Sequence, residues 1–222
     1  LMRWIFRNLF VHPLIWWNYT VTLRGTDDAL SCTNGAILVS NHISRLDGPF
    51  IMSIGWPYAR VRPTAWHAEY SHWLQWPLMK LFGTVPLGSP KHLPEEVRLR
   101  RKEWAIATMQ KILRAGRHLL IFAEGSISDG SRVTIKPHLA GVHDLIAAYP
   151  EMPVLLIRLD GLQYSAFGKL PKRLGLFRRL PVSATFTRVD NVSLAGGPAG
   201  LNARLEAFFN ADVPLATTSA QK

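Results

Sequence analysis

The sequence predicts an α/β fold: a single domain with a largely parallel sheet flanked by helices, preceded by an N-terminal membrane-associating helical segment. Apolar runs of strand length alternate with helical segments along the whole chain, which is typical of a sheet with crossover helices. Two runs, Ala36–Ser40 and His118–Ala123, are almost wholly apolar, as expected for parallel strands buried on both faces. A chain of 222 residues is long enough for one such domain and short for two.

The other elements are expected around these two strands. Further strands are expected at Val21–Arg24, Val61–His67, Gly83–Leu87, Pro153–Leu159 and Val182–Val189. Helices are expected at Asp47–Ile54, Tyr70–Phe82, Pro94–Arg114, Pro137–Tyr149 and Leu201–Asn210. Of these, Pro94–Arg114 is the clearest, because proline suits a first helical turn and Gly116 suits the stop. Its expected apolar face consists of Val97, Trp104, Ile106, Ala107 and Ile112.

Three regions are expected along the chain. Residues 1–20 form the membrane-associating segment, residues 21–212 the folded domain and residues 213–222 a frayed tail. The first region reads as a helix pair or as one helix broken at Pro13, and polar residues interrupt it too often for it to span a bilayer. It lacks the cleavage site of a signal peptide. A second amphipathic segment, Phe167–Leu180, mixes five cations with leucine and phenylalanine and is also expected at a membrane surface.

The net charge of +11 predicts attraction to a polyanion: a nucleic acid, an anionic bilayer or an acidic carrier protein. Eight tryptophans among the lysines and arginines favour the bilayer, where indole rings sit among the headgroups. No helix-turn-helix, zinc or RNA-recognition pattern is present, so nucleic acid is not expected as a partner. The single cysteine, Cys32, excludes an intramolecular disulfide and indicates a reducing compartment.

Polar loops follow both buried strands, and ligands of parallel sheets collect at these carboxyl ends. One loop contains His42, five residues before Asp47. A carboxylate at this spacing can orient the imidazole and stabilise its protonated form, which leaves the other ring nitrogen to take a proton from a hydroxyl group. The same spacing also fits a surface histidine beside a helix-capping aspartate, so the spacing alone leaves both interpretations open.

Four blocks in order carry a resemblance to a known family. The segment Asn41–Asp47 looks like an NHxxxxD block, Glu124-Gly125-Ser126 is similar to an FPEGT block, and Met152–Leu156 is similar to a VPV block. These blocks resemble the glycerolipid acyltransferase family, whose members acylate lysophosphatidate and other lysolipids. The run from Arg158 to Leu170 also looks like the branch that re-acylates lysophosphatidylethanolamine.

The resemblance implies a role for each matching residue. His42 is expected to be the general base and Asp47 the residue that orients it. The residues expected to contact the acceptor or the acyl chain are Asn41, Arg45, Glu124, Gly125, Ser126 and Pro153. Backbone N–H groups near Gly125 are expected to stabilise the oxyanion. The donor is expected to be acyl-CoA or an acyl-carrier protein, with no metal, no other cofactor and no covalent intermediate, on the cytoplasmic face of the cell membrane.

The sequence departs from the family at two positions. Ser89 and Ile127 stand where lysophosphatidate acyltransferases of the family carry arginines. Bidentate guanidinium contacts are the strong way to hold a phosphate dianion, so a lysophospholipid with another headgroup is the expected acceptor. Lys91, Arg132 and Lys136 are the cations expected to replace the arginines. The alternatives are a 1-acylglycerol-3-phosphate acyltransferase and a non-catalytic basic protein that binds lipid or nucleic acid.

Overall fold

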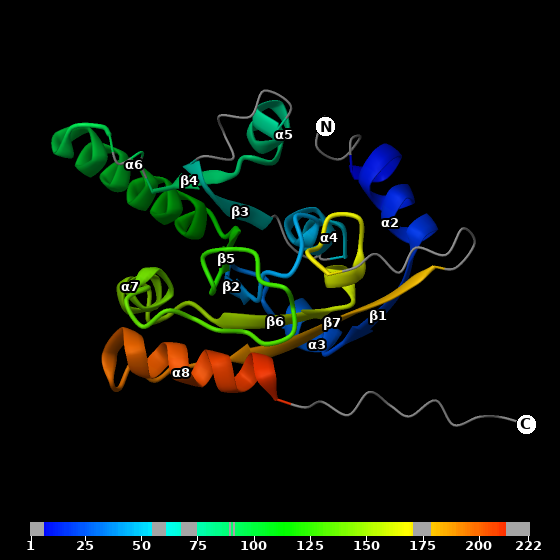
Figure 1. Cartoon of the computed structure of the whole chain (residues 1–222). Helices are drawn as coiled ribbons and strands as arrows, with labels where there is room; N and C mark the ends of the chain where they lie inside the picture. Colours follow the sequence, from blue (N-terminus) through cyan, green and yellow to red (C-terminus); the bar gives the residue numbers. More distant parts are fainter. Residues whose placement is uncertain are drawn as a thin grey trace, which may run out of the picture.

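The computed structural model describes residues 7–54, 61–67, 75–88, 90, 92–170 and 179–211. Within them, seven strands form one sheet in the order β1-β7-β6-β2-β5-β3-β4 (Figure 1). The strands are β1 (Tyr19–Arg24), β2 (Ile37–Ser40), β3 (Val61–Trp66), β4 (Val85–Leu87), β5 (His118–Phe122), β6 (Val154–Asp160) and β7 (Leu180–Val189). Five neighbouring strands, from β6 to β4, run parallel, whereas β7 is antiparallel to β6 and pairs in parallel with β1.

Helices cover both faces of the sheet (Figure 1). The helices are the π-helix η1 (Arg7–Val11), α2 (His12–Asn18), α3 (Thr26–Ser31), α4 (Asp47–Ile54), α5 (Gln75–Phe82), α6 (Glu95–Arg114), α7 (Gly141–Ala148), the 3-10 helix η3 (Leu162–Tyr164) and α8 (Gly197–Asn210). One apolar cluster joins the sheet to α6, α7 and α8, and a second joins it to α2 and α4.

The central strands explain both clusters. Along β2, Ile37 and Val39 belong to the first cluster and Leu38 to the second, because successive side chains of a strand point to opposite faces. All four residues of β2 are buried, which confirms the strand buried on both faces that the sequence predicted. The register pairs Ser40 with Phe122, so β2 and β5 end level with each other.

Most predicted elements are confirmed, although α8 begins at Gly197 rather than Leu201, and α3, α6 and α7 also differ from the prediction. Helix α7 begins at Gly141 rather than Pro137, because the backbone oxygens of Lys136 and Leu139 accept hydrogen bonds from the Asn202 side chain of α8 instead of starting a helix. Helix α3 was not predicted. The predicted apolar face of α6 is wrong in part: Ala105, Ile112 and Leu113 are buried, but Val97, Ile106 and Trp104 are exposed, Trp104 by 55%.

The N-terminal segment is described from residue 7 onward, and Pro13 lies in the first turn of α2 instead of breaking a longer helix. Most of the second amphipathic segment, residues 171–178, lies outside the described residues, as do Ser89, Lys91 and the tail from residue 212. In the part of the chain that the structure describes, no helix combines the length and the apolar character needed to cross a bilayer.

Candidate active site

Two loops meet at the carboxyl edge of the sheet. The loop after β2 carries His42 and leads into α4, whose first residue is Asp47. The loop after β5 carries Glu124 and Gly125. Because β2 and β5 are adjacent and end level, the residues that follow them are brought together, as the sequence predicted.

The Asp47 carboxylate holds the His42 ring. Oδ2 of Asp47 lies 2.8 Å from Nδ1 of His42 and also accepts hydrogen bonds from the backbone N–H groups of Ile43, at 2.7 Å, and Ser44, at 2.9 Å. Since this oxygen is already an acceptor for two donors, Nδ1 of His42 is assigned as the third donor. The other ring nitrogen, Nε2, is then the proton acceptor, and it has no hydrogen-bond partner among the described residues.

Burial distinguishes the two side chains. The Asp47 side chain is fully buried, whereas the His42 side chain is 19% exposed to solvent. Burial raises the pKa of the Asp47 carboxyl, and the hydrogen bonds from His42, Ser44 and Ile43 oppose that rise. The arrangement therefore has a fixed, desolvated carboxylate behind an imidazole that solvent or a substrate can reach.

Phe122 fixes the plane of the imidazole. Its ring stacks on that of His42 with the centroids 4.1 Å apart and the planes 16° apart. The stacked ring leaves His42 little freedom to rotate about its side-chain torsions. Phe122 is the last residue of β5, so the strand that neighbours β2 supplies one wall of the site.

The β5 loop also holds the backbone of His42 on both sides. Oε2 of Glu124 accepts a 2.6 Å hydrogen bond from the His42 N–H group. The backbone N–H and the hydroxyl of Ser128 donate to the His42 carbonyl oxygen at 2.7 and 3.1 Å. Glu124 is buried, and this hydrogen bond gives it a role in positioning His42, while the acceptor contact expected from the sequence stays a prediction.

The Glu124 carboxyl makes the free energy of unfolding depend on pH. Burial raises the pKa of this carboxyl, and the hydrogen bond from His42 opposes the rise. A raised folded-state pKa means that its contribution to stability is fully present below the unfolded-state pKa and is lost as pH rises through the folded-state value.

We therefore expect the free energy of unfolding of Glu124→Gln, relative to that of the wild type, to increase as pH is raised across that range. Glutamine keeps an oxygen for the His42 N–H group but carries no proton to lose. Urea titrations of both proteins at a series of pH values measure the difference. A difference that stays constant or falls with rising pH would contradict the assignment.

The turn after Glu124 is exposed. Gly125 has a φ of +65°, a conformation that side chains other than glycine rarely adopt, and its N–H group donates to the Phe122 oxygen at 3.2 Å. That N–H group is therefore not available to an oxyanion. The N–H groups of Ser126 and Ile127 make no hydrogen bond with any described residue, so they are the available donors in this turn.

Two residues expected to contact the substrate are placed elsewhere. The Asn41 side chain is buried, and its amide donates to the Leu159 oxygen at 2.9 Å and accepts from the Leu159 N–H group at 2.8 Å. The carbonyl of Pro153 accepts from the Ile37 N–H group at the amino end of β2, the opposite end from His42. Asn41 therefore ties the loop to β6, and Pro153 lies away from the catalytic edge.

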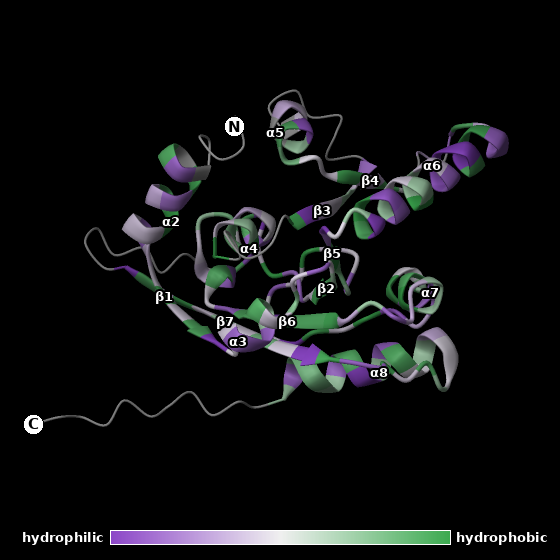
Figure 2. Ribbon diagram, turned by 180° about the vertical axis from the view of Figure 1, so that it is seen from behind, coloured by the Kyte–Doolittle hydropathy of each residue, from purple (hydrophilic) through white to green (hydrophobic). Residues whose placement is uncertain are grey.

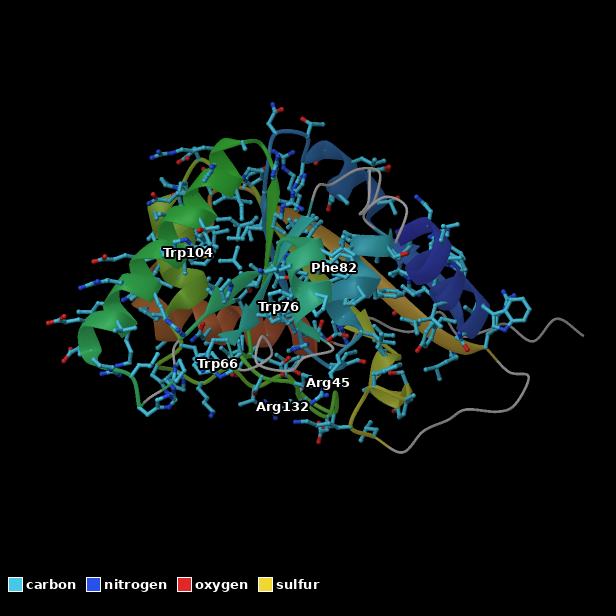
Figure 3. The ribbon with its side chains drawn as sticks, turned by 90° about the horizontal axis from the view of Figure 1, so that it is seen from above. Arg45, Trp66, Trp76, Phe82, Trp104 and Arg132 are labelled. Atoms are coloured by element: carbon cyan, nitrogen blue, oxygen red, sulfur yellow. The ribbon has the colours of Figure 1, made fainter. Side chains whose placement is uncertain are left out.

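The expected cations divide into three groups. Arg45 and Arg132 are both exposed, and Figure 3 shows them toward the same side of the molecule in the view from above. Lys136 is exposed, and its backbone oxygen is bound by the Asn202 side chain of α8. Lys91 lies outside the described residues. Lys169, which the sequence did not single out, donates through Nζ to the Ile127 oxygen and so ties the loop after β6 to the Gly125 turn.

The loop after β6 closes over the catalytic loop. The Arg45 N–H group donates to the Phe167 oxygen at 3.2 Å, and Ser44 and Gly168 form an isolated β-bridge. A Cβ atom at Gly168 would lie 2.1 Å from the Gln163 oxygen, so only glycine permits this approach. Sequence reasoning missed Phe122, Ser128 and Gly168 as positioning residues; the signal available was their place beside or inside the blocks that carry the resemblance.

A small apolar cavity of about 40 Å³ lies between the sheet, α3 and α4, away from His42. Its lining includes Leu38, Ile51, Leu155, Phe186 and His118. This volume holds about one water molecule, so the cavity is too small for an acyl chain. Within the described residues, no three histidine, cysteine, aspartate or glutamate side chains are grouped closely enough to hold a metal ion.

Comparison with known proteins shows the family to which the chain belongs. The family model Acyltransferase matches residues 21–157, more than half of the chain and a span that holds both loops. The fold is similar to the crystal structure of the 1-acyl-sn-glycerophosphate (LPA) acyltransferase PlsC from Thermotoga maritima. The two share 17% identity with a TM-score of 0.64, over 93% of this chain and 76% of that one. The resemblance to the glycerolipid acyltransferases is thus confirmed: the chain belongs to the Acyltransferase family.

Proposed function

We propose that the protein transfers a fatty acyl group from an acyl thioester, acyl-CoA or acyl-carrier protein, to the hydroxyl of a lysophospholipid. The observation that carries the proposal is the 2.8 Å contact between His42 and the buried Asp47, which leaves the second imidazole nitrogen as a proton acceptor. Family membership and the similar fold support an acyltransferase reaction at this site.

The proposed reaction uses one proton and no covalent enzyme intermediate. Nε2 of His42 removes the proton of the acceptor hydroxyl as its oxygen forms a bond to the thioester carbonyl carbon. Asp47 stabilises the imidazolium that results. The tetrahedral intermediate collapses by breaking the carbon–sulfur bond, and the imidazolium returns the proton to the leaving thiolate. The products are the diacyl lipid and the free thiol of the donor.

The negative oxygen of the intermediate needs donors that are already in place. The N–H groups of Ser126 and Ile127 are the candidates, because they are unpaired among the described residues and follow the loop that grips the His42 backbone. We place the oxyanion beside this turn.

Mass spectrometry of the products from a panel of lysolipids with a long-chain acyl thioester tests the reaction. The expected result is one new diacyl lipid and one free thiol per turnover. If only free fatty acid is formed, the protein is a hydrolase. If no substrate is turned over, the result favours a non-catalytic lipid-binding protein.

The acceptor is proposed to carry a phosphodiester headgroup, such as that of lysophosphatidylethanolamine, in preference to lysophosphatidate. Ile127 supplies no positive charge, and Arg45 and Arg132 are exposed, where each pairs weakly with an anion. A phosphomonoester dianion that is only partly compensated costs several kcal/mol on leaving water, and a phosphodiester monoanion costs less.

We expect competition kinetics to give a higher kcat/KM for lysophosphatidylethanolamine than for lysophosphatidate. Arg45→Gln and Arg132→Gln are each expected to lower kcat/KM for both lipids, because each change removes a cation that can contact the headgroup phosphate. A higher kcat/KM for lysophosphatidate would mean that these cations suffice for a dianion, and the protein would then be a 1-acylglycerol-3-phosphate acyltransferase.

The lipid substrates are proposed to reach the site from the cytoplasmic face of the cell membrane, with the protein bound peripherally or monotopically. Exposed apolar side chains on η1 and α2 support this: Leu9, Leu14, Trp16 and Trp17. Helix α2 lies beside α4, where Nδ1 of His12 and the hydroxyl of Ser53 are 3.3 Å apart. The N-terminal segment is thus attached to the helix that Asp47 begins.

A further inference from the structure

Large apolar side chains that remain exposed are concentrated on one part of the described structure. Six of the twelve lie on β3, α5 and α6, and none lies on α7 or α8. The six are Trp66, Trp76, Val97, Leu99, Trp104 and Ile106. Figure 2 shows α6 banded in green and purple, as a helix is when apolar and charged residues share its outer surface. Exposed apolar side chains that gather on one part of a protein surface indicate a contact with another protein, a ligand or a membrane.

Trp66 connects this patch with the catalytic edge. It is the last residue of β3, and β3 pairs with β5 so that Pro63 lies opposite Leu120. Continuing that register places Trp66 level with Ala123, one residue before Glu124. Since only β5 separates β3 from β2, Trp66 lies about 10 Å from the end of β2 along the edge. Its indole remains 54% exposed.

Helix α6 carries cations and Trp104 on the edge of the sheet next to Trp66, because α6 packs on β4, whose Leu87 pairs with Trp66 of β3. Burial, and then the positive charges of Arg101 and His92, lower the pKa of His67, the residue after Trp66. Trp104 follows Arg101 by three residues and so lies on the same side of the helix. Helix α6 carries six basic residues (Arg98, Arg100, Arg101, Lys102, Lys111 and Arg114) and three acidic ones.

Helix α5 contributes a third tryptophan with its own cation. Nζ of Lys80 lies 4.0 Å from the ring centroid of Trp76, which is 45% exposed. An indole with an ammonium group over its face is an arrangement suited to the headgroup layer, where the ring is half buried and the cation meets lipid phosphate. In Figure 3, Trp76, Trp66 and Trp104 are distributed over α5, β3 and α6 in the view from above.

From these contacts we infer that Trp66, Trp76, Trp104, Lys80 and Arg101 form a tryptophan surface that lies on the headgroups of an anionic bilayer. The charges fit an anionic lipid layer, and three indoles on three separate elements fit a broad interface better than they fit the compact acidic helix of a carrier protein. Figure 1 shows α2, α5 and α6 all toward the upper side of the molecule, so the same bilayer meets the N-terminal apolar residues. The inference rests on the proposed lipid acceptor.

Vesicle co-sedimentation of the whole chain tests the inference. The background is His42→Ala, so that binding is measured without turnover and the result is independent of the proposed reaction. Vesicles of phosphatidylcholine, with and without phosphatidylglycerol, are the probes. Trp76→Ser combined with Trp104→Ser is expected to weaken binding to the anionic vesicles about tenfold. Raised salt is expected to weaken the vesicle binding of the His42→Ala protein without abolishing it.

Leu30→Ser provides the matched control. Leu30 is an exposed apolar residue on α3, which packs on β7, near the edge of the sheet opposite to β3 and β4. It is expected to leave vesicle binding unchanged. Circular dichroism melting of each variant shows that the fold is retained. Equal binding by the double variant and its background would overturn the inference. So would unchanged vesicle binding combined with a loss of affinity for an acyl-carrier protein, which would assign the surface to the donor.

Discussion

Replacing His42 with alanine is expected to lower kcat/KM for acyl transfer about 1,000-fold or more, because the variant lacks the imidazole nitrogen that takes the hydroxyl proton. The loss is expected in kcat with KM nearly unchanged, since the base acts in the transition state. The fold is expected to survive, because Oδ2 of Asp47 keeps its hydrogen bonds from the N–H groups of Ile43 and Ser44.

His42→Asn is the matched variant, since its side-chain amide keeps a donor toward Asp47 but has no basic nitrogen. It is expected to be as inactive as His42→Ala while melting closer to the wild type. Added imidazole is expected to restore part of the activity of the alanine variant by occupying the vacated space next to Phe122. Activity of either variant within about threefold of the wild type would rule out the proposed base.

Replacing Asp47 with asparagine is expected to lower kcat/KM by about 100-fold to 1,000-fold. Three donors converge on Oδ2, so the asparagine oxygen takes that place and its NH₂ group takes the place of Oδ1. Oδ1 has no hydrogen-bond partner among the described residues, so the new NH₂ group is buried without one. The neutral amide also no longer stabilises the imidazolium.

Kinetics separate this role from a purely structural one. An orienting group is expected to be needed for kcat while the fold is retained. A helix cap that only stabilises α4 would change the melting temperature and leave kcat/KM in place. If Asp47→Asn changes only thermal stability, Asp47 is a cap and the mechanism lacks its orienting group.

The sequence predicts the fold well where local pattern decides it. The buried strands β2 and β5 are uninterrupted apolar runs, and α4 begins and ends where predicted. It predicts α6 less well, because the periodicity of that helix does not reveal that mainly its second half packs on the sheet. Val97 and Trp104 look like core residues in the sequence and are exposed in the structure.

The site shows the same division. The His42–Asp47 pair could be predicted because both residues belong to one loop and one helix start. The partners of Asn41 and of the His42 backbone could not, since Leu159 and Ser128 lie 118 and 86 residues away in sequence and their contacts depend on the register of the sheet. The substrate role predicted for Asn41 and Glu124 stays a prediction, and the structure adds the backbone groups that their side chains bind.

The Asn41 side chain acts as a surrogate peptide group. Strand β2 ends at Ser40, yet the amide of Asn41 donates to and accepts from Leu159 of β6 as one more backbone unit would. The chain can therefore leave the plane of the sheet at residue 41 without exposing the end of the ladder. An aspartate here would have no donor for the Leu159 oxygen, and a glutamine would place its amide one carbon farther from the backbone. The direction in which the chain leaves the sheet toward His42 thus depends on the side chain of Asn41, and anyone grafting the loop that carries His42 onto another parallel sheet must transplant Asn41 with it.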